Sequence, residues 1–541
     1  MIGHPTDHYR AGARIGKRAM GTCCCGPYEV RSYPTARRAL KIDLRRDQSF
    51  HIKVSCDGCM NALRVMCLIS LLALQAVAQE SLTYRVEYST ARSGRVHVAI
   101  APAKTLKGPL TLVIPRAIPS GYAQQFYDRY VEDVKATSSA GSPLKTEREE
   151  GPRWRVGGSD AEVAQVEYDV DVTRLEREIV QASDTSKVRP EYVGLLGYTF
   201  LGYLEGMENM PIRLDVNGPK GWPIFTTLAP KLPVDNTRTS GEAKDFYALA
   251  DSQIAMGPKL EVRRLDAPLP LFLIAYAELE TDLKRHGEVF ADAFRKVLAY
   301  FGEAPFAHYT AYIEILKPLS EQHEYGFSME HLDSSTYFLG VDRAITSSTT
   351  PEQMERDRFN FAHHVSHSWI PKKVYGTGYL PFNWELAPQI ETIWFNEGFA
   401  RYVAIEALAD PLPEKEGREF RKRQLEGYRK TLDAMPEFIR AMPLTELSRV
   451  ASLMYSGDFR TGRTLFTKGV LMAAEMDERI RERTGGKKRL RDSLRAMVKW
   501  GQQSRRAFQI DELPALISRP VGVGEREIGE ILERWLTAGK K

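Results

Sequence analysis

Apolar and polar residues alternate along the chain from Leu82 to about Pro268. Runs such as Thr83–Tyr88 (TYRVEY) and Arg95–Ile100 (RVHVAI) alternate with a period of two, which is typical of half-buried strands. Polar breaks separate them from similar runs. The pattern therefore predicts an N-terminal β domain over residues 79–268, built as a sandwich or a saddle-like sheet. Further strands are expected at Leu110–Ile114, Val163–Val172 and Pro211–Val216.

The periodicity changes from about Leu269 onward. Residues His286–Phe301 carry apolar side chains at helical spacing, and Glu355–Ile370 forms a second helix that stops at Pro371. Between these helices lie a strand, Tyr309–Leu316, and a second strand that runs through Tyr325–His331. We expect an α+β multidomain protein, in which residues 269–410 form the second domain and residues 411–541 a helical C-terminal domain. Its helices are expected at Leu465–Arg483, Leu490–Trp500 and Ile528–Ala538.

A secretory signal is expected near the N-terminus. A short basic start is followed by an apolar run, Val65–Ala76, which ends in Ala-Val-Ala at Ala78. The run is shorter than the ~20 apolar residues that span a bilayer. Met60 stands where such a signal would begin, so we interpret residues 60–78 as a signal peptide and residues 1–59 as an upstream extension foreign to the natural protein. The protein is then exported, periplasmic or secreted, with no stable membrane anchor after cleavage.

The distribution of cysteine and charge agrees with this division. The first 78 residues hold 12 basic and 5 acidic residues, so the net charge of +5 for the whole chain becomes −2 for the remainder. A basic balance that would favour nucleic acid as a partner is therefore absent from the expected mature chain. A lone Cys-x-x-Cys in a basic, patternless stretch is weak evidence for a redox or metal pair. All six cysteines precede the expected cleavage site: Cys23, Cys24, Cys25, Cys56, Cys59 and Cys67.

The most informative feature is a cluster of three histidines. His363 and His367 stand one helical turn apart, and Glu397 follows thirty residues after His367 in an aromatic-rich segment that reads as a second helix. Two imidazoles and one carboxylate are what a tetrahedral zinc site with an open fourth position needs. The alternative is a metal-free relic in which the three side chains hydrogen-bond to one another. His364 occupies the position of the glutamate base in the H-E-x-x-H motif.

This segment resembles the glycyl aminopeptidase family of zinc peptidases, which is metallopeptidase family sixty-one of the gluzincin type. The family pattern is H-E-x-x-H-x-W, a proline soon after, and W-x-x-E-G-F about thirty residues after the second histidine. The resemblance implies a thermolysin-like domain at 269–410 and Zn²⁺ held by His363, His367 and Glu397. The residues that carry it are His363, His367, Trp369, Pro371 and Trp394-Phe395-Asn396-Glu397-Gly398-Phe399.

A second segment extends the resemblance toward the substrate. Phe327–His331 (FSMEH) is similar to the family's G-G-L-E-H strand. The resemblance implies that Glu330 holds the free α-amino group of a substrate, with Met329 beside it in the substrate site. Gly206–Asn209 (GMEN) imitates another aminopeptidase signature, but it lies far from the histidines in the sequence and we interpret it as a decoy.

Three departures from the family pattern bear on catalysis. His364 replaces the general base, and Phe466 replaces a tyrosine whose hydroxyl supports the tetrahedral intermediate. Losing a base costs ~10²–10⁴-fold and losing an oxyanion donor ~10²–10³-fold. Phe327-Ser328 replaces a Gly-Gly pair. His364 could itself accept a proton, since its ordinary pKa is about 6.5, or it could ligate the metal and close the site. Tyr455 and His331 are the other possible substitutes for the base.

Three functions follow. Our leading hypothesis is an exported zinc-binding protein of this family that is weakened or inactive as a peptidase and binds peptides or protein N-termini through their free amino group. The second is an active zinc aminopeptidase that uses His364 or another residue as its base. The third is a non-catalytic scaffold with a structural metal or none. The sequence does not indicate the oligomeric state.

Overall fold

The computed structural model describes residues 81–92, 94–180, 185–232, 237–455 and 457–537. The expected extension 1–59, the expected signal 60–78 and all six cysteines lie outside the described residues. Every described residue belongs to one compact unit of the chain. Across the described ranges no helix combines the length and the apolar character that crossing a membrane requires.

Three sheets form the N-terminal part of this unit. An eight-stranded sheet has the order β15-β13-β1-β2-β9-β5-β6, with β3 also paired to β9. Its strands are β1 (Leu82–Tyr88), β2 (Arg95–Pro102), β3 (Leu106–Lys107), β5 (Val131–Ser138), β6 (Pro143–Leu144), β9 (Glu162–Asp171), β13 (Ile212–Asn217) and β15 (Arg238–Ala243). The second sheet contains β4 (Leu110–Val113), β7 (Thr146–Arg148), β8 (Arg153–Val156) and β12 (Tyr203–Leu204). The third contains β10 (Lys187–Arg189), β11 (Tyr192–Leu196), β14 (Ile224–Thr226) and β16 (Gln253–Met256).

The alternation in the sequence explains the strands of the eight-stranded sheet. In β1, Leu82, Tyr84, Val86 and Tyr88 are buried while the residues between them are more exposed. All three sheets contribute to one hydrophobic core, into which short helices α2 (Val172–Glu178) and α3 (Phe246–Ala250) also pack. The five predicted N-terminal strands are confirmed to within two residues at each end.

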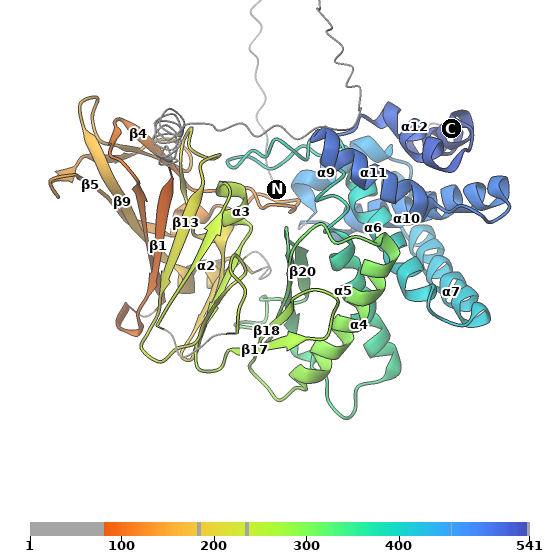
Figure 1. Cartoon of the computed structure of the whole chain (residues 1–541), viewed down its shortest axis with the longest axis horizontal. Helices are drawn as coiled ribbons and strands as arrows, with labels where there is room; N and C mark the ends of the chain where they lie inside the picture. Colours follow the sequence, from red (N-terminus) through yellow and green to blue (C-terminus); the bar gives the residue numbers. More distant parts are fainter. Residues whose placement is uncertain (1–80, 93, 181–184, 233–236, 456, 538–541) are drawn as a thin grey trace, which may run out of the picture. The chain divides into compact units, whose positions relative to one another are not determined.

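A fourth sheet carries the candidate site. It has the order β17-β18-β19-β21-β20, in which β18, β19 and β21 run parallel while β17 and β20 pair antiparallel at the edges. Helices α4 (Leu283–Phe301), α5 (Pro351–Ser366) and α6 (Ile393–Ala409) lie beside this sheet (Figure 1). The strands are β17 (Glu261–Leu265), β18 (Leu271–Ala277), β19 (Tyr309–Leu316), β20 (Phe327–Glu330) and β21 (Ser334–Gly340). This sheet thus begins before residue 269.

The histidine helix differs from its predicted limits of Glu355 and Ile370. It starts at Pro351, because Thr350 and Gln353 form a capping box that satisfies the first backbone N–H groups. It ends at Ser366, so His367 is its C-cap residue rather than a residue of its last turn. The predicted helix at His286–Phe301 is confirmed as α4, whose N-cap is Asp282.

The C-terminal part is helical and packs on α6. Gly398 of α6 and Gly469 of α10 meet so closely that a Cβ atom on Gly398 would lie 2.4 Å from Cα of Gly469. The two helices therefore cross backbone to backbone. The chain is thus a mixed α+β protein with N-terminal sheets and a helical C-terminal region. The C-terminal helices are α7 (Glu414–Asp433), α8 (Glu437–Arg440), α9 (Leu444–Met454), α10 (Phe459–Thr484), α11 (Leu490–Ser504), α12 (Leu513–Ser518) and α13 (Glu525–Thr537).

Candidate metal centre and cleft

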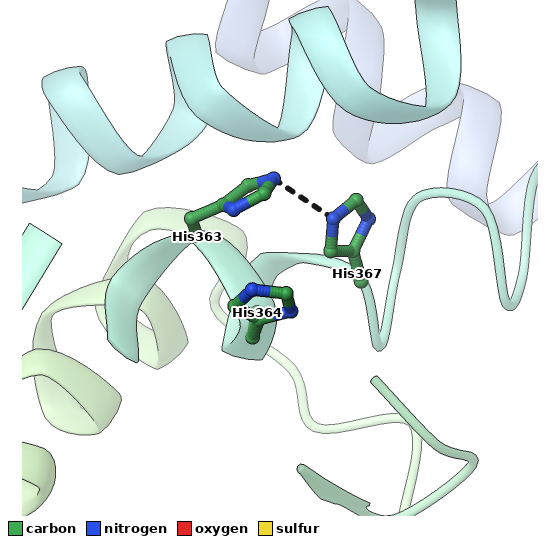
Figure 2. A group of neighbouring side chains, drawn as sticks. All are labelled: His363, His364 and His367. Atoms are coloured by element: carbon green, nitrogen blue, oxygen red, sulfur yellow. Dashed lines mark hydrogen bonds between the residues drawn. The ribbon is translucent and has the colours of Figure 1, made fainter. Parts of the chain in front are cut away.

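Three of the predicted residues converge on one point. The Nε2 atoms of His363 and His367 lie 2.9 Å apart, and Figure 2 shows the two rings turned toward each other. Glu397 Oε2 lies 3.2 Å from His363 Nε2 and 3.6 Å from His367 Nε2. Helix α5 and its cap supply the imidazoles, while α6 brings the carboxylate from the facing helix. The donor set is two nitrogens and one oxygen, all buried.

Neighbouring groups hold these side chains in place. Nδ1 of His367 lies 2.8 Å from the carbonyl oxygen of Ile370, which accepts its proton and leaves the lone pair of Nε2 facing Glu397. The hydroxyl of Tyr122, in the N-terminal part of the chain, donates a hydrogen bond of 3.1 Å to the second carboxylate oxygen of Glu397. Such supporting partners fix the orientation of metal ligands.

Burial and charge set the protonation of this cluster. Burial holds the pKa of His363 well below its ordinary value. Burial also opposes the charged form of His367, but the carboxylates of Glu330 and Glu397 outweigh it and raise the pKa of that imidazole. The pKa of Glu397 lies well below its usual range, because His367 and His363 outweigh the burial that would raise it. The carboxylate is therefore ionised and available as a ligand.

The three residues fit a zinc ion. Zinc bonds of about 2.0–2.1 Å in a tetrahedron set the ligand atoms about 3.3 Å apart. The observed separations of 2.9, 3.2 and 3.6 Å bracket this value. Two lone-pair-bearing groups, Nε2 of His367 and the Glu397 carboxylate, face each other, an arrangement that a cation stabilises. A proton shared among the three side chains would also satisfy it, which is the metal-free alternative.

His364 does not lie with its two neighbours. Its ring points to another side of the helix end (Figure 2), and its Nδ1 is 3.6 Å from Glu330 Oε2. Burial lowers the pKa of His364, which favours the neutral form of its ring. The same Glu330 oxygen is 4.0 Å from His367 Nε2. The carboxylate expected to receive an amino group thus already faces two imidazoles.

A cleft of about 400 Å³ opens over the centre. Six of the seven predicted site residues line it, namely Met329, Glu330, His363, His364, Glu397 and Phe466, while His367 lies fully buried behind them. Phe327 contacts Phe459 of α10 with ring centroids 5.5 Å apart, and both line the cleft. The side chain that replaces the first glycine of the family strand therefore narrows the opening.

Tyr455 and His331, the two possible substitutes for the base, differ in their position relative to the cleft. Tyr455 lines the cleft, with its ring 5.7 Å from Phe466 and 6.0 Å from Tyr122. Burial raises the pKa of Tyr455, so its hydroxyl can donate a hydrogen bond but is a poor base. His331 is fully buried, hydrogen-bonded to Asp251 and Thr336, and does not line the cleft.

Tyr122 and Arg401 are among the cleft residues that sequence reasoning missed. Tyr122 contacts Glu397 across 275 positions of sequence, a separation that no local pattern signals. Arg401 lines the cleft one helical turn after Glu397, and its i+4 spacing could have suggested this. The GMEN segment at Gly206–Asn209 lies in a loop and does not line the cleft, in agreement with its interpretation as a decoy.

Comparison with known proteins shows similarities in the N-terminal domain and in the fold. Residues 83–258 match the Peptidase M61 N-terminal domain family. No curated protein matches the chain. An aminopeptidase N family protein from Idiomarina loihiensis superposes with a TM-score of 0.72 at 18% identity, covering 85% of this chain and 76% of that one. Native yeast LTA4 hydrolase superposes with a TM-score of 0.51 at 14% identity, covering 85% and 68%. At these identities the likeness concerns the fold. The comparisons thus show an N-terminal domain of the Peptidase M61 type at residues 83–258 and an overall fold similar to that of an aminopeptidase N family protein.

Proposed function

We propose that this chain is an exported zinc-binding protein of the glycyl aminopeptidase type, weakened or inactive as a peptidase, which binds peptides through a free N-terminus. One observation carries the proposal: the ligand atoms of His363, His367 and Glu397 converge in the cleft, while His364 stands in place of the base and faces Glu330. The residues that would bind zinc are thus retained, while the residues at the positions of the base and of the tyrosine hydroxyl differ from the family pattern.

Zinc held by the three ligands would act as a Lewis acid toward a peptide carbonyl. Glu330 supplies the contact for a peptide amino group. It ends the edge strand β20, and His367 and His364 outweigh burial and lower the pKa of its carboxyl, so the group is a carboxylate. An ammonium group pairs with a buried carboxylate through charge-assisted hydrogen bonds. Peptides with acetylated amino termini are therefore expected to bind much more weakly.

Three features support weak catalysis. His364 differs from a glutamate in reach and lies 3.6 Å from Glu330, and Phe466 has no hydroxyl. Phe327 narrows the cleft against Phe459. The loss of base and donor together lowers turnover by ~10⁴–10⁷-fold when the two costs multiply.

The test is peptidase activity of the purified, zinc-loaded protein beside a His364→Glu variant, on a panel of aminoacyl and short-peptide substrates. We expect no turnover from the native protein and slow turnover from His364→Glu, which would indicate an intact zinc cleft. Cleavage by the native protein that His364→Ala abolishes would instead establish an active aminopeptidase with His364 as its base. If the protein retains no zinc after dialysis, the result would favour the third function, a non-catalytic scaffold without a metal.

A second candidate is a closed structural zinc site. The ligand nitrogens of His363, His364 and His367 lie within 4.8 Å of one another, which favours His364 as an additional ligand after a small rotation. The absorption spectrum of the cobalt-substituted protein distinguishes the two. In an open site the spectrum changes when a peptide or a small anion binds, whereas a site closed by His364 responds only after His364→Ala.

The proposal extends to the type of each domain and to the location of the protein. We infer that β17–β21 with α4–α6 form a thermolysin-like unit, since an antiparallel edge strand borders the cleft and two helices carry the ligands. We infer a sandwich or saddle for the N-terminal sheets, which share one core. Export with cleavage near Ala78 predicts that the mature protein starts at Gln79, which intact-mass measurement of the exported protein would test.

A further inference from the structure

Arg401 is a cation in the wall of the cleft. It follows Glu397 by four residues on α6, so both side chains lie on the same helix face. Its guanidinium lies 4.8 Å from the ring centroid of Phe466, the residue that replaces the family tyrosine. Arg401, Phe466 and Glu330 all line the same cleft. The cleft therefore holds an anionic group, Glu330, and a cationic group, Arg401, neither of which belongs to the proposed zinc ligand set.

Arg401 forms no ion pair with any residue that the structure describes. No carboxylate oxygen of the described residues lies within 4.0 Å of its guanidinium, and its buried Nε has no hydrogen-bond partner. Other arginines of low exposure are paired: Arg189 with Glu176 at 2.6 Å, and Arg343 with Asp357. A charge withdrawn from water without a partner is costly, so an unpaired guanidinium in a cleft indicates a partner that arrives from outside.

The nearest negative group does not fill this role. Glu397 acts on Arg401 through its charge, but its oxygens contact His363, His367 and Tyr122. A zinc ion at those residues would further neutralise that carboxylate. The other polar groups that act on Arg401 are the hydroxyls of Tyr428 and Tyr455, and neither is a carboxylate. The positive charge of Arg401 thus remains directed to the cleft.

We propose that Arg401 recognises a carboxylate of the bound peptide, so that the cleft selects short peptides with an ammonium group at Glu330 and a carboxylate at Arg401. The inference rests on the proposed peptide-binding function and narrows its ligand class. The carboxylate is either the C-terminus of a short peptide or an acidic side chain. Both sources offer two oxygens to the planar guanidinium, which binds them in a fork geometry. The cleft volume lies within the range of small-ligand sites, ~300–1,000 Å³.

The experiment measures binding of four peptides to the zinc-loaded protein by calorimetry. The peptides are Ala-Ala-Ala as free acid, the same peptide as C-terminal amide, and the amides of Ala-Glu-Ala and Ala-Gln-Ala. We expect the acidic peptide to bind about 10- to 100-fold tighter than its neutral match in one of the two pairs, the range for a charged hydrogen bond. Preference for the free acid identifies the C-terminus, and preference for Glu over Gln identifies a side chain.

Variants separate recognition from structure. Arg401→Met keeps the apolar stem over Phe466, and we expect it to abolish the preference while binding of the neutral amides stays unchanged. Arg401→Lys should retain part of the preference. Arg418→Met is the matched control, because it removes an exposed arginine that pairs with Glu414 outside the cleft. Equal melting temperatures of the variants would exclude unfolding as the cause.

Failure of this inference differs from failure of the proposed function. If the native protein binds acidic and neutral peptides equally, or if Arg401→Met weakens the neutral amides as much as the acids, Arg401 does not recognise a carboxylate, and the proposed function stands. If none of the four peptides binds, the peptide-binding function fails and this inference with it.

Discussion

At the scale of single residues, Tyr122 links the N-terminal part of the chain to the metal centre. Its hydroxyl donates to Glu397, and removal of such a supporting contact typically weakens metal binding 10- to 100-fold. We therefore expect Tyr122→Phe to raise the dissociation constant for zinc by that factor, measured by competition with a chelator. Tyr84→Phe is the control, since it removes a buried hydroxyl that donates to Gly202 away from the cleft. Equal zinc affinity of the two variants would show that the contact has no effect.

A second residue makes stability depend on pH. Burial lowers the pKa of His286 to about 4, and its Nδ1 has no hydrogen-bond partner. The unfolded chain binds this proton near pH 6.5 and the folded chain near pH 4, so stability is full above about 6.5 and falls as the pH drops toward 4. We expect urea unfolding of His286→Asn to depend less on pH than that of the native protein in this window. If the stability of the variant and of the native protein changed with pH to the same extent, this prediction would be wrong.

The candidate residues divide into those that sequence could predict and those that it could not. His363, His367 and Glu397 stand on two helices at short, fixed spacings, so the pattern of side chains indicates a shared site. Tyr122 reaches the site from a loop that follows β4, far from Glu397 in sequence, and the pairing of His364 with Glu330 depends on where β20 lies beside α5. Contacts of this kind arise from tertiary packing, so they cannot be predicted from local patterns in a single sequence.

At the scale of elements, the crossing of α6 and α10 keeps Glu397 beside Phe466. A Cβ on Gly398 would meet the backbone of Gly469, which cannot move away cheaply. Overpacking typically costs ~1–3 kcal/mol, so Gly398→Ala should destabilise the protein by about that amount and also weaken zinc binding. Gly427→Ala on α7 is the matched control: a Cβ there meets open space, and we expect it to stabilise by about 0.5–1 kcal/mol. Denaturant melts of both variants test the pair, and a neutral Gly398→Ala would refute the tight crossing.

Element types were more predictable than their ends. Strand alternation in β1 and β2 and the helical period of α4 are local properties, and the structure confirms them. The start of α5 depends on the capping box at Thr350, and hydrophobic periodicity does not reveal a cap of this kind. Short strands such as β14 and β16 were not predicted, because three or four buried residues do not show a period.

At the scale of the whole molecule, a buried ion pair joins the N-terminal sheets to the sheet of the cleft. Lys187 of β10 lies 3.2 Å from Glu314 of β19, and each side chain is only 1% exposed. Hydroxyls of Tyr192 and Tyr312 donate to the same carboxylate. Breaking such a pair from one side typically costs ~3–5 kcal/mol, because the remaining charge stays buried. We expect Lys187→Met to destabilise the chain by that amount.

Because the pair spans both parts, we expect them to unfold together. Circular dichroism and zinc release, followed in the same urea titration, should show one midpoint in the native protein and a common, lower midpoint in Lys187→Met. The double variant Lys187→Met/Glu314→Gln removes both charges and should recover part of the loss. If zinc release keeps its native midpoint while the dichroism shifts, the N-terminal sheets unfold independently of the cleft. In that case the hydrogen bond from Tyr122 to Glu397 would break before the metal is released.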